Sequence, residues 1–196
     1  MKAVLDHNGY FTGDYAMIGS LEGSIEVESI PTETDRLKLK SYKFENGVWT
    51  FDSEHHQSLY KEQQAKELAS LKQQKAEKSK KNLEQYIQTH KITSSCHGGI
   101  EKQYSATSEN QQHLNNMILT TLMAATNELS YQPSWNASGE ECTNDWTLEE
   151  LVQLSMEIEA FIRPLVVKQQ AQETAIQNAC SIEELEQISI TFEQEG

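Results

Sequence analysis

The sequence predicts an α+β fold: a small N-terminal β module, a long connecting helix, and a compact C-terminal α+β domain whose helices pack on a short antiparallel sheet. Three observations support this prediction. Short alternating apolar runs separated by glycines fill residues 1–52, and a stretch rich in Gln, Lys, Glu and Ala without Gly or Pro fills residues 53–90. Residues 91–196 combine hairpin signals with helix caps and broad apolar faces.

Residues 1–52 carry strand and turn signals, of which the segment "YKFENGVWTFD" is the clearest. Asn46 and Gly47 separate two alternating runs, and both residue types adopt the positive φ angles that a two-residue hairpin turn needs. We therefore expect a β-hairpin here. A module of this size has little core, so we expect it to dock on a partner surface.

Residues 53–90 predict a long, solvated helix of roughly 50 Å at about 1.5 Å per residue. Its apolar stripe is thin and is interrupted by Lys72 and Ser79, which leaves too little apolar area for the core of a monomer. We expect this stripe to meet copies of itself. The predicted oligomer-interface residues are Leu68, Ala69, Ala76, Leu83 and Ile87.

The C-terminal part begins with two strand-like runs around Gly98 and Gly99, which predict a second hairpin. Ser108 and Gln111 have the spacing of a capping box, which would open a helix that reaches about residue 129. The segment after Pro133 reads as a loop or a third strand pair. Thr147 with Glu150, and Ser181 with Glu184, predict the starts of a long buried helix and a short last helix.

Charge and composition exclude several classes of partner. The formal net charge is −14, and only the segment Lys61 to Lys81 is basic, so we expect no binding to nucleic acid. No apolar run approaches the length of a membrane span, and the N-terminus lacks the apolar core of a secretory signal. The three widely spaced cysteines are typical of free thiols in a protein made in a cytoplasm.

A search for chemistry finds no catalytic pattern. There is no nucleophile in a Gly-flanked turn with a following His and acid, and no phosphate-binding loop. The candidate metal ligands, His55, His56, Cys96, His97, His113 and Cys142, lack a recognisable ligand spacing. We therefore predict a protein that is not an enzyme and that has no catalytic residues, no cofactor and no metal site.

Three aromatic residues near one polar loop form a candidate partner or glycan contact: Tyr131, Trp135 and Trp146. Aromatic rings in such places are more often part of a core, although their faces can also stack on sugars or anchor an interface. Both interpretations stay open at the level of sequence.

The residues from Ile92 to Ile190 resemble an uncharacterised domain family of phage and prophage tail genes. Four parts carry the resemblance in order: a short strand segment, "SATSENQQHLNNMILTTLMAA", "PSWNASGEECTNDWTLEEL" and "AIQNACSIEELEQI". The N-terminal "HNGYFTGDYAMIGSLEGSIEVESIP" and "YKFENGVWTFD" look like the start of small proteins encoded among the baseplate and receptor-binding genes of phages. The quoted motifs are scaffold residues, so the resemblance transfers no functional residue.

The resemblance implies a non-enzymatic structural component of a phage tail tip, baseplate or tail-fibre apparatus, made in the cytoplasm of the host bacterium and located in the virion tail. Its partners would be tail, baseplate or fibre proteins. The threefold symmetry common in tail tips points to a homotrimer. Two alternatives stay open: a tail-fibre assembly chaperone absent from the mature virion, and a carbohydrate-binding or host-receptor module.

Overall fold

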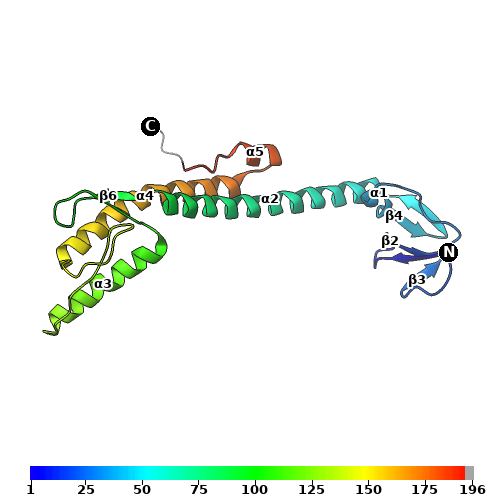
Figure 1. The fold of residues 1–196 in the computed structure, drawn as a ribbon. Helices are drawn as coiled ribbons and strands as arrows, with labels where there is room; N and C mark the ends of the chain where they lie inside the picture. Colours follow the sequence, from blue (N-terminus) through cyan, green and yellow to red (C-terminus); the bar gives the residue numbers. More distant parts are fainter. Residues whose placement is uncertain (193–196) are drawn as a thin grey trace. The chain divides into compact units, whose positions relative to one another are not determined.

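The computed structural model describes residues 1–192 and has the predicted α+β architecture (Figure 1). The chain forms two compact units, an N-terminal unit of Met1–Ser70 and a C-terminal unit of Leu71–Gly196. The boundary differs from the predicted divisions at residues 52 and 90 because it falls inside the long helix α2, Ser53–Thr89. Each unit is described by itself.

The N-terminal unit contains five strands and one short helix. The strand order β2-β1-β3 makes a three-stranded antiparallel sheet, and β4 pairs with β5 in a separate two-stranded sheet. The elements are β1 Lys2–Leu5, β2 Phe11–Ala16, β3 Ser24–Glu26, α1 Arg36–Leu39, β4 Tyr42–Glu45 and β5 Val48–Phe51. This arrangement confirms the prediction of a β-rich module.

The hairpin of β4 and β5 turns at the residues that the sequence indicated. Asn46 and Gly47 have φ angles of 52° and 82°, which lie in the left-handed region. Trp49 on β5 donates a hydrogen bond of 2.8 Å from its indole nitrogen to the carbonyl of Ser29. The core of the unit is small and consists of Ala3, Phe11 and Val27 with Ile30, Leu39, Phe44 and Trp49 packed against it.

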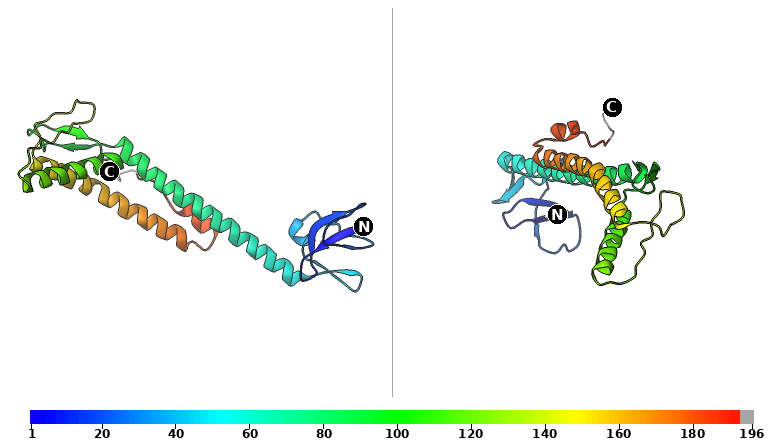
Figure 2. Two further views of the ribbon diagram at one scale, coloured as in Figure 1. Left: turned by 90° about the horizontal axis from the view of Figure 1, so that it is seen from below. Right: turned by 90° about the vertical axis from the view of Figure 1, so that its left-hand side faces the viewer.

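The second half of α2 pairs with α4, Leu148–Asn178, within the C-terminal unit. Ser79 donates a hydrogen bond of 2.7 Å from Oγ to Gln172 Oε1, and Lys72 Nζ donates one of 2.7 Å to the carbonyl of Gln177. Because low numbers on α2 meet high numbers on α4, the two helices run antiparallel and lie side by side (Figure 2).

This pairing corrects one step of the sequence reasoning. The stripe of α2 was expected to lack a partner within its own chain, but from Leu71 onward it has one in α4. Ser79, which interrupts the apolar pattern, is fully buried because its hydroxyl is satisfied by Gln172. Sequence alone did not show this because the contact is polar and joins residues far apart in the chain.

The remaining elements of the C-terminal unit match the predicted order. They are β6 Ile92–Ser94, β7 Lys102–Tyr104, α3 Ser108–Thr126, α4 and α5 Ile182–Gln187. β6 and β7 form the predicted antiparallel hairpin. The capping box of Thr147 with Glu150 is confirmed, and Ser181 is the N-cap of α5.

One predicted cap is wrong by a residue. The N-cap of α3 is Thr107, whose hydroxyl accepts a hydrogen bond from the backbone N–H of Asn110, and Ser108 is the first helical residue. Gln111 donates its side-chain N–H to the carbonyl of Ala106 and so leaves the predicted box with Ser108 unformed. Two adjacent hydroxyl residues are equivalent at the level of pattern, and tertiary packing chooses between them.

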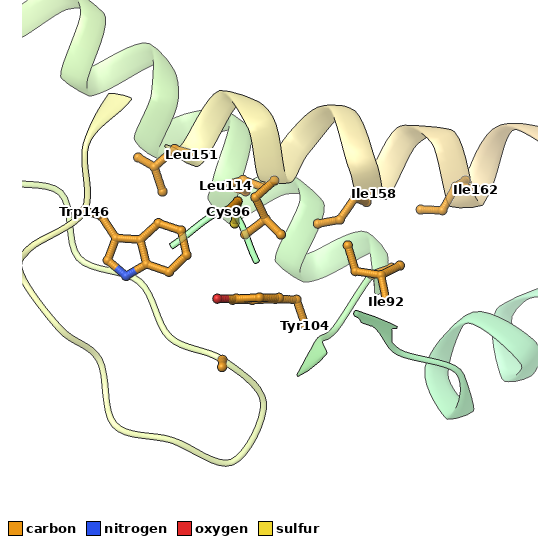
Figure 3. Packing of buried hydrophobic residues seen from close by; sticks show 11 residues of the cluster. Ile92, Cys96, Tyr104, Leu114, Trp146, Leu151, Ile158 and Ile162 are labelled. Atoms are coloured by element: carbon orange, nitrogen blue, oxygen red, sulfur yellow. The ribbon is translucent and has the colours of Figure 1, made fainter. Parts of the chain in front are cut away.

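The core of the C-terminal unit lies between α4, α3 and the hairpin of β6 and β7 (Figure 3). Four buried residues of α4 recur at spacings of three and four, which is the spacing of one helix face. They are Leu151, Leu154, Ile158 and Ile162. They pack with Ile92, Cys96, Tyr104, Ala106, Leu114, Ala137 and Trp146.

Candidate functional site

The C-terminal unit contains a pocket of about 470 Å³ between α3 and the segment of residues 131–142. This volume lies within the range of small-ligand sites, roughly 300–1,000 Å³. The lining residues are Ser105, Asn110, His113, Asn116, Met117, Thr120, Tyr131, Ser134, Trp135, Asn136, Ser138 and Cys142. We call this the aromatic-amide pocket.

One face of α3 supplies the polar wall of the pocket. Asn110, His113, Asn116 and Thr120 recur every three or four residues, so their side chains project from one side of the helix. Leu114 lies on a neighbouring face and is buried in the core. The contact of Leu114 with the core therefore fixes α3, and the polar face of the helix lines the pocket.

The opposite wall is a loop that backbone hydrogen bonds hold in place. Trp135 and Thr143 form an isolated antiparallel bridge, with N–H to carbonyl distances of 3.2 and 2.9 Å. Ser138 donates its backbone N–H to the carbonyl of Gln103 on β7 at 2.8 Å. These hydrogen bonds hold the loop to itself and to β7, so the backbone of the pocket-lining residues is fixed in position.

Trp146 anchors the end of this loop in the core. Its side chain is 2% exposed and its ring stacks on His97 at a centroid distance of 4.2 Å. Tyr104 approaches the same ring edge-on at 6.0 Å (Figure 3). Of the two interpretations that the sequence leaves open for Trp146, the structure favours the core one, because the ring is covered by its own unit.

The other two aromatic candidates do lie together. Tyr131, which is 42% exposed, and the half-buried Trp135 both line the aromatic-amide pocket. Trp135 also packs against the core of the unit. The structure thus separates the three predicted residues into one core residue and two pocket residues.

Several hydrogen-bonding groups of the pocket are not engaged within the protein. Among the described residues, the side chains of the half-buried Asn110 and Ser134 and of the exposed His113 and Asn116 have no hydrogen-bond partner within the protein. The hydroxyl of Ser138 is buried and also lacks one. Asn136 differs, because its side-chain N–H groups bind the carbonyls of Ala137 and Glu140 at 3.0 Å each.

The charged groups near Trp146 lie outside the pocket lining and stabilise the fold. Glu150 accepts hydrogen bonds from the Thr147 backbone at 2.8 Å and pairs with His97 Nδ1 at 3.1 Å. Burial raises the pKa of Glu150, but the hydrogen bonds from Thr147 and Gly98 and the nearby His97 outweigh it, so the net pKa is lowered. Glu150 is thus held as a carboxylate at the start of α4.

The buried hydroxyl and thiol near Trp146 are held in their neutral forms. Burial raises the pKa of Tyr104 to about 12 and also raises the pKa of the Cys96 thiol. A thiol held neutral is a poor nucleophile. Within residues 1–192, no group of three or more His, Cys, Asp or Glu side chains is placed to hold a metal ion.

The predicted oligomer-interface residues fall on both sides of the unit boundary. Leu68 and Ala69 belong to the N-terminal unit, where Leu68 is half-buried and Ala69 is exposed. Ala76, Leu83 and Ile87 belong to the C-terminal unit and are half-buried. Ile87 packs against the main core, and Leu83 lies with it beside Ile162 and Val166 of α4 in a second pocket of about 680 Å³.

Comparisons with known protein families, with curated proteins and with solved structures find no match to this chain. None of the helices in residues 1–192 carries an apolar stretch long enough to cross a membrane.

Sequence reasoning missed the contribution of α3 to the pocket. At the level of sequence, His113 is considered only as a candidate metal ligand, and Asn110 and Asn116 are assigned no role. The signal that could have identified them is the recurrence of amide and imidazole side chains along one face, next to a loop that contains two aromatic residues. Ser138 carried no such signal, because its burial arises from the tertiary fold.

Proposed function

We propose that this chain is a non-enzymatic adaptor of a phage tail tip, baseplate or tail-fibre apparatus, in which each unit binds a different tail protein. The observation that supports it best is the organisation of the chain as two compact units, each with its own core, that share the residues of one helix, α2. An adaptor needs two separately folded binding surfaces. The resemblance of the sequence to phage tail proteins supplies the biological setting.

Exposed apolar residues support a binding role for the N-terminal unit. Ile18 is 95% exposed and Met17 is 66% exposed, in the turn that follows the edge strand β2. Tyr15 on β2 itself is half exposed. Apolar side chains grouped at a sheet edge are typical of a surface that another protein covers.

The C-terminal unit presents a comparable group on α3. Leu119, Leu122 and Met123 are each more than half exposed, although they belong to a helix whose other face is buried. Apolar residues in such a group mark protein contacts more often than isolated ones do. We also propose self-association as a trimer through the N-terminal part of the α2 stripe, at Leu68 and Ala69.

Quantitative mass spectrometry of purified virions tests the location. The adaptor role predicts peptides of this chain at a fixed ratio to other tail proteins in particles from the phage or induced prophage that encodes it. A deletion strain, complemented in trans, is the matched control. Complete absence from particles, together with misfolded fibres in the deletion strain, would replace the adaptor by the assembly chaperone.

A further inference from the structure

We propose that the aromatic-amide pocket is a binding site for a neutral saccharide. This inference stands on the pocket alone and goes beyond the adaptor role, so either can fail without the other. It concerns the twelve lining residues given above, all of which lie in the C-terminal unit.

The first argument is the charge of the pocket. The chain as a whole carries a formal charge of −14, yet none of the twelve lining residues is an Asp, Glu, Lys or Arg. A site for a phosphate, a carboxylate or an amine would present an opposite charge to its ligand. A pocket walled mainly by amides, hydroxyls and aromatic rings, with the imidazole of His113, matches an uncharged polar ligand.

The second argument is the pair of aromatic side chains. Trp135 and Tyr131 line the pocket from the loop, and Trp135 is fixed by the core on one side and by its bridge to Thr143 on the other. A fixed ring gives an apolar surface at little entropic cost. The C–H faces of a pyranose ring are the part of a sugar that such a surface can cover.

The third argument is the set of unengaged hydrogen-bonding groups. The side-chain amides of Asn110 and Asn116 each offer donors and an acceptor, and the hydroxyl of Ser134 offers both. Ser138 adds a buried hydroxyl without a partner in the described residues. A sugar hydroxyl is itself a donor and an acceptor, so a ring with several hydroxyls would satisfy these groups.

The test titrates the full-length chain with neutral saccharides and follows binding by saturation-transfer NMR and by tryptophan fluorescence. The probes are glucose, galactose, mannose, rhamnose, N-acetylglucosamine and the disaccharides of each. Glucuronic acid and glucosamine serve as anionic and cationic comparators of the same ring size. We expect at least one neutral saccharide to bind the protein. The charged comparators should bind the protein more weakly than that saccharide or not at all.

Two variants assign the binding to this pocket. Trp135→Ala should weaken binding by about tenfold or more, as the loss of a central aromatic contact does. Asn116→Ala removes a side chain that has no hydrogen bond in the described chain, and should weaken binding by roughly threefold to tenfold with folding unchanged. Trp49→Phe, in the N-terminal unit, is the fluorescence control and should bind like the wild type.

Three outcomes would overturn the proposal. The first is that no neutral saccharide binds at millimolar concentration. The second is binding that is unchanged in both Trp135→Ala and Asn116→Ala. The third is tighter binding of a charged comparator than of its neutral counterpart. Because Asn116 is exposed and its side chain makes no hydrogen bond within the described residues, Asn116→Ala should fold, and the result stays decisive even if Trp135→Ala does not.

Discussion

At the scale of single residues, Trp146 fixes the end of the loop that borders the pocket, and Glu150 fixes the start of α4. Trp146 fills the core between His97 and Tyr104, and Glu150 caps α4 while it pairs with His97. The sequence indicated the role of Glu150, because a capping box is local. It did not decide the role of Trp146, because the partners of a tryptophan come from distant parts of the chain.

Truncation of Trp146 should lower the free energy of unfolding of the C-terminal unit more than a substitution on its surface does. We expect Trp146→Ala to lower the free energy of unfolding by about 3 to 5 kcal/mol, the usual cost of removing a buried large aromatic side chain. Val152→Ala, at a partly exposed position on α4, the helix that follows Trp146, should stay within about 0.5 kcal/mol of the wild type. Urea unfolding followed by circular dichroism measures both, and equal effects would show that Trp146 is not part of the core.

The Glu150 carboxylate should contribute stability that depends on pH. Glu150→Ala should lose about 1 to 2 kcal/mol at neutral pH, because the capping hydrogen bonds and the pairing with His97 go with it. The folded-state pKa of Glu150 is lowered, so the benefit of its charge is present above the unfolded pKa of about 4.5 and is lost as pH falls through the folded value.

Glu150→Gln isolates the charge, because glutamine keeps the shape and can still cap the helix. The difference in unfolding free energy between the wild type and Glu150→Gln should be largest above about pH 5 and should shrink as the pH is lowered toward 3. Chemical denaturation over this range is the measurement. A difference that grows on acidification would contradict the lowered pKa.

At the scale of elements, local sequence signals were sufficient to predict the hairpin turn and two helix caps. They were not sufficient to predict which helices pair over long range. The hairpin at Asn46-Gly47 and the caps at Thr147 and Ser181 followed from residues close together in the sequence. The antiparallel pairing of α2 with α4 could not be predicted, because it joins Ser79 to Gln172 through a polar contact in a thin apolar stripe. The pocket was missed in part for the same reason, since it needs α3 and the loop together.

The Ser79 and Gln172 pair gives a direct test of this helix pairing. Ser79→Ala leaves Gln172 Oε1 without its donor, and should cost about 1 to 3 kcal/mol of unfolding free energy because both groups are buried. The double variant Ser79→Ala with Gln172→Leu removes both polar groups and should recover part of that loss. Additive effects in this double-mutant cycle would show that the two side chains do not interact.

At the scale of the whole molecule, the two units use the apolar stripe of α2 in different ways. Half of the stripe on α2 is already used inside the C-terminal unit, so Leu83 and Ile87 are part of its fold, while Leu68 and Ala69 belong to the N-terminal unit. An acidic substitution at Leu83 should therefore affect the fold of the C-terminal unit.

Two variants separate folding from self-association. Leu83→Asp should destabilise the C-terminal unit by about 1 to 3 kcal/mol at every protein concentration, because a charge would enter the half-buried site beside Ile162 and Val166. Leu68→Asp should leave that unit's stability unchanged and act only on the proposed trimer. Light scattering over a dilution series, paired with thermal unfolding, measures both. Dissociation by Leu83→Asp without loss of stability would contradict the role of Leu83 in the fold and would assign it to the trimer interface alone.

The adaptor role is tested most directly by cross-linking mass spectrometry on assembled tails. Exposed lysines mark each unit: Lys61 in the N-terminal unit, and Lys91 and Lys168 in the C-terminal unit. Lys61 should cross-link to one tail protein, and Lys91 and Lys168 to a different one. Cross-links from both units to the same partner, or a chain that forms none with any tail protein, would contradict the adaptor role.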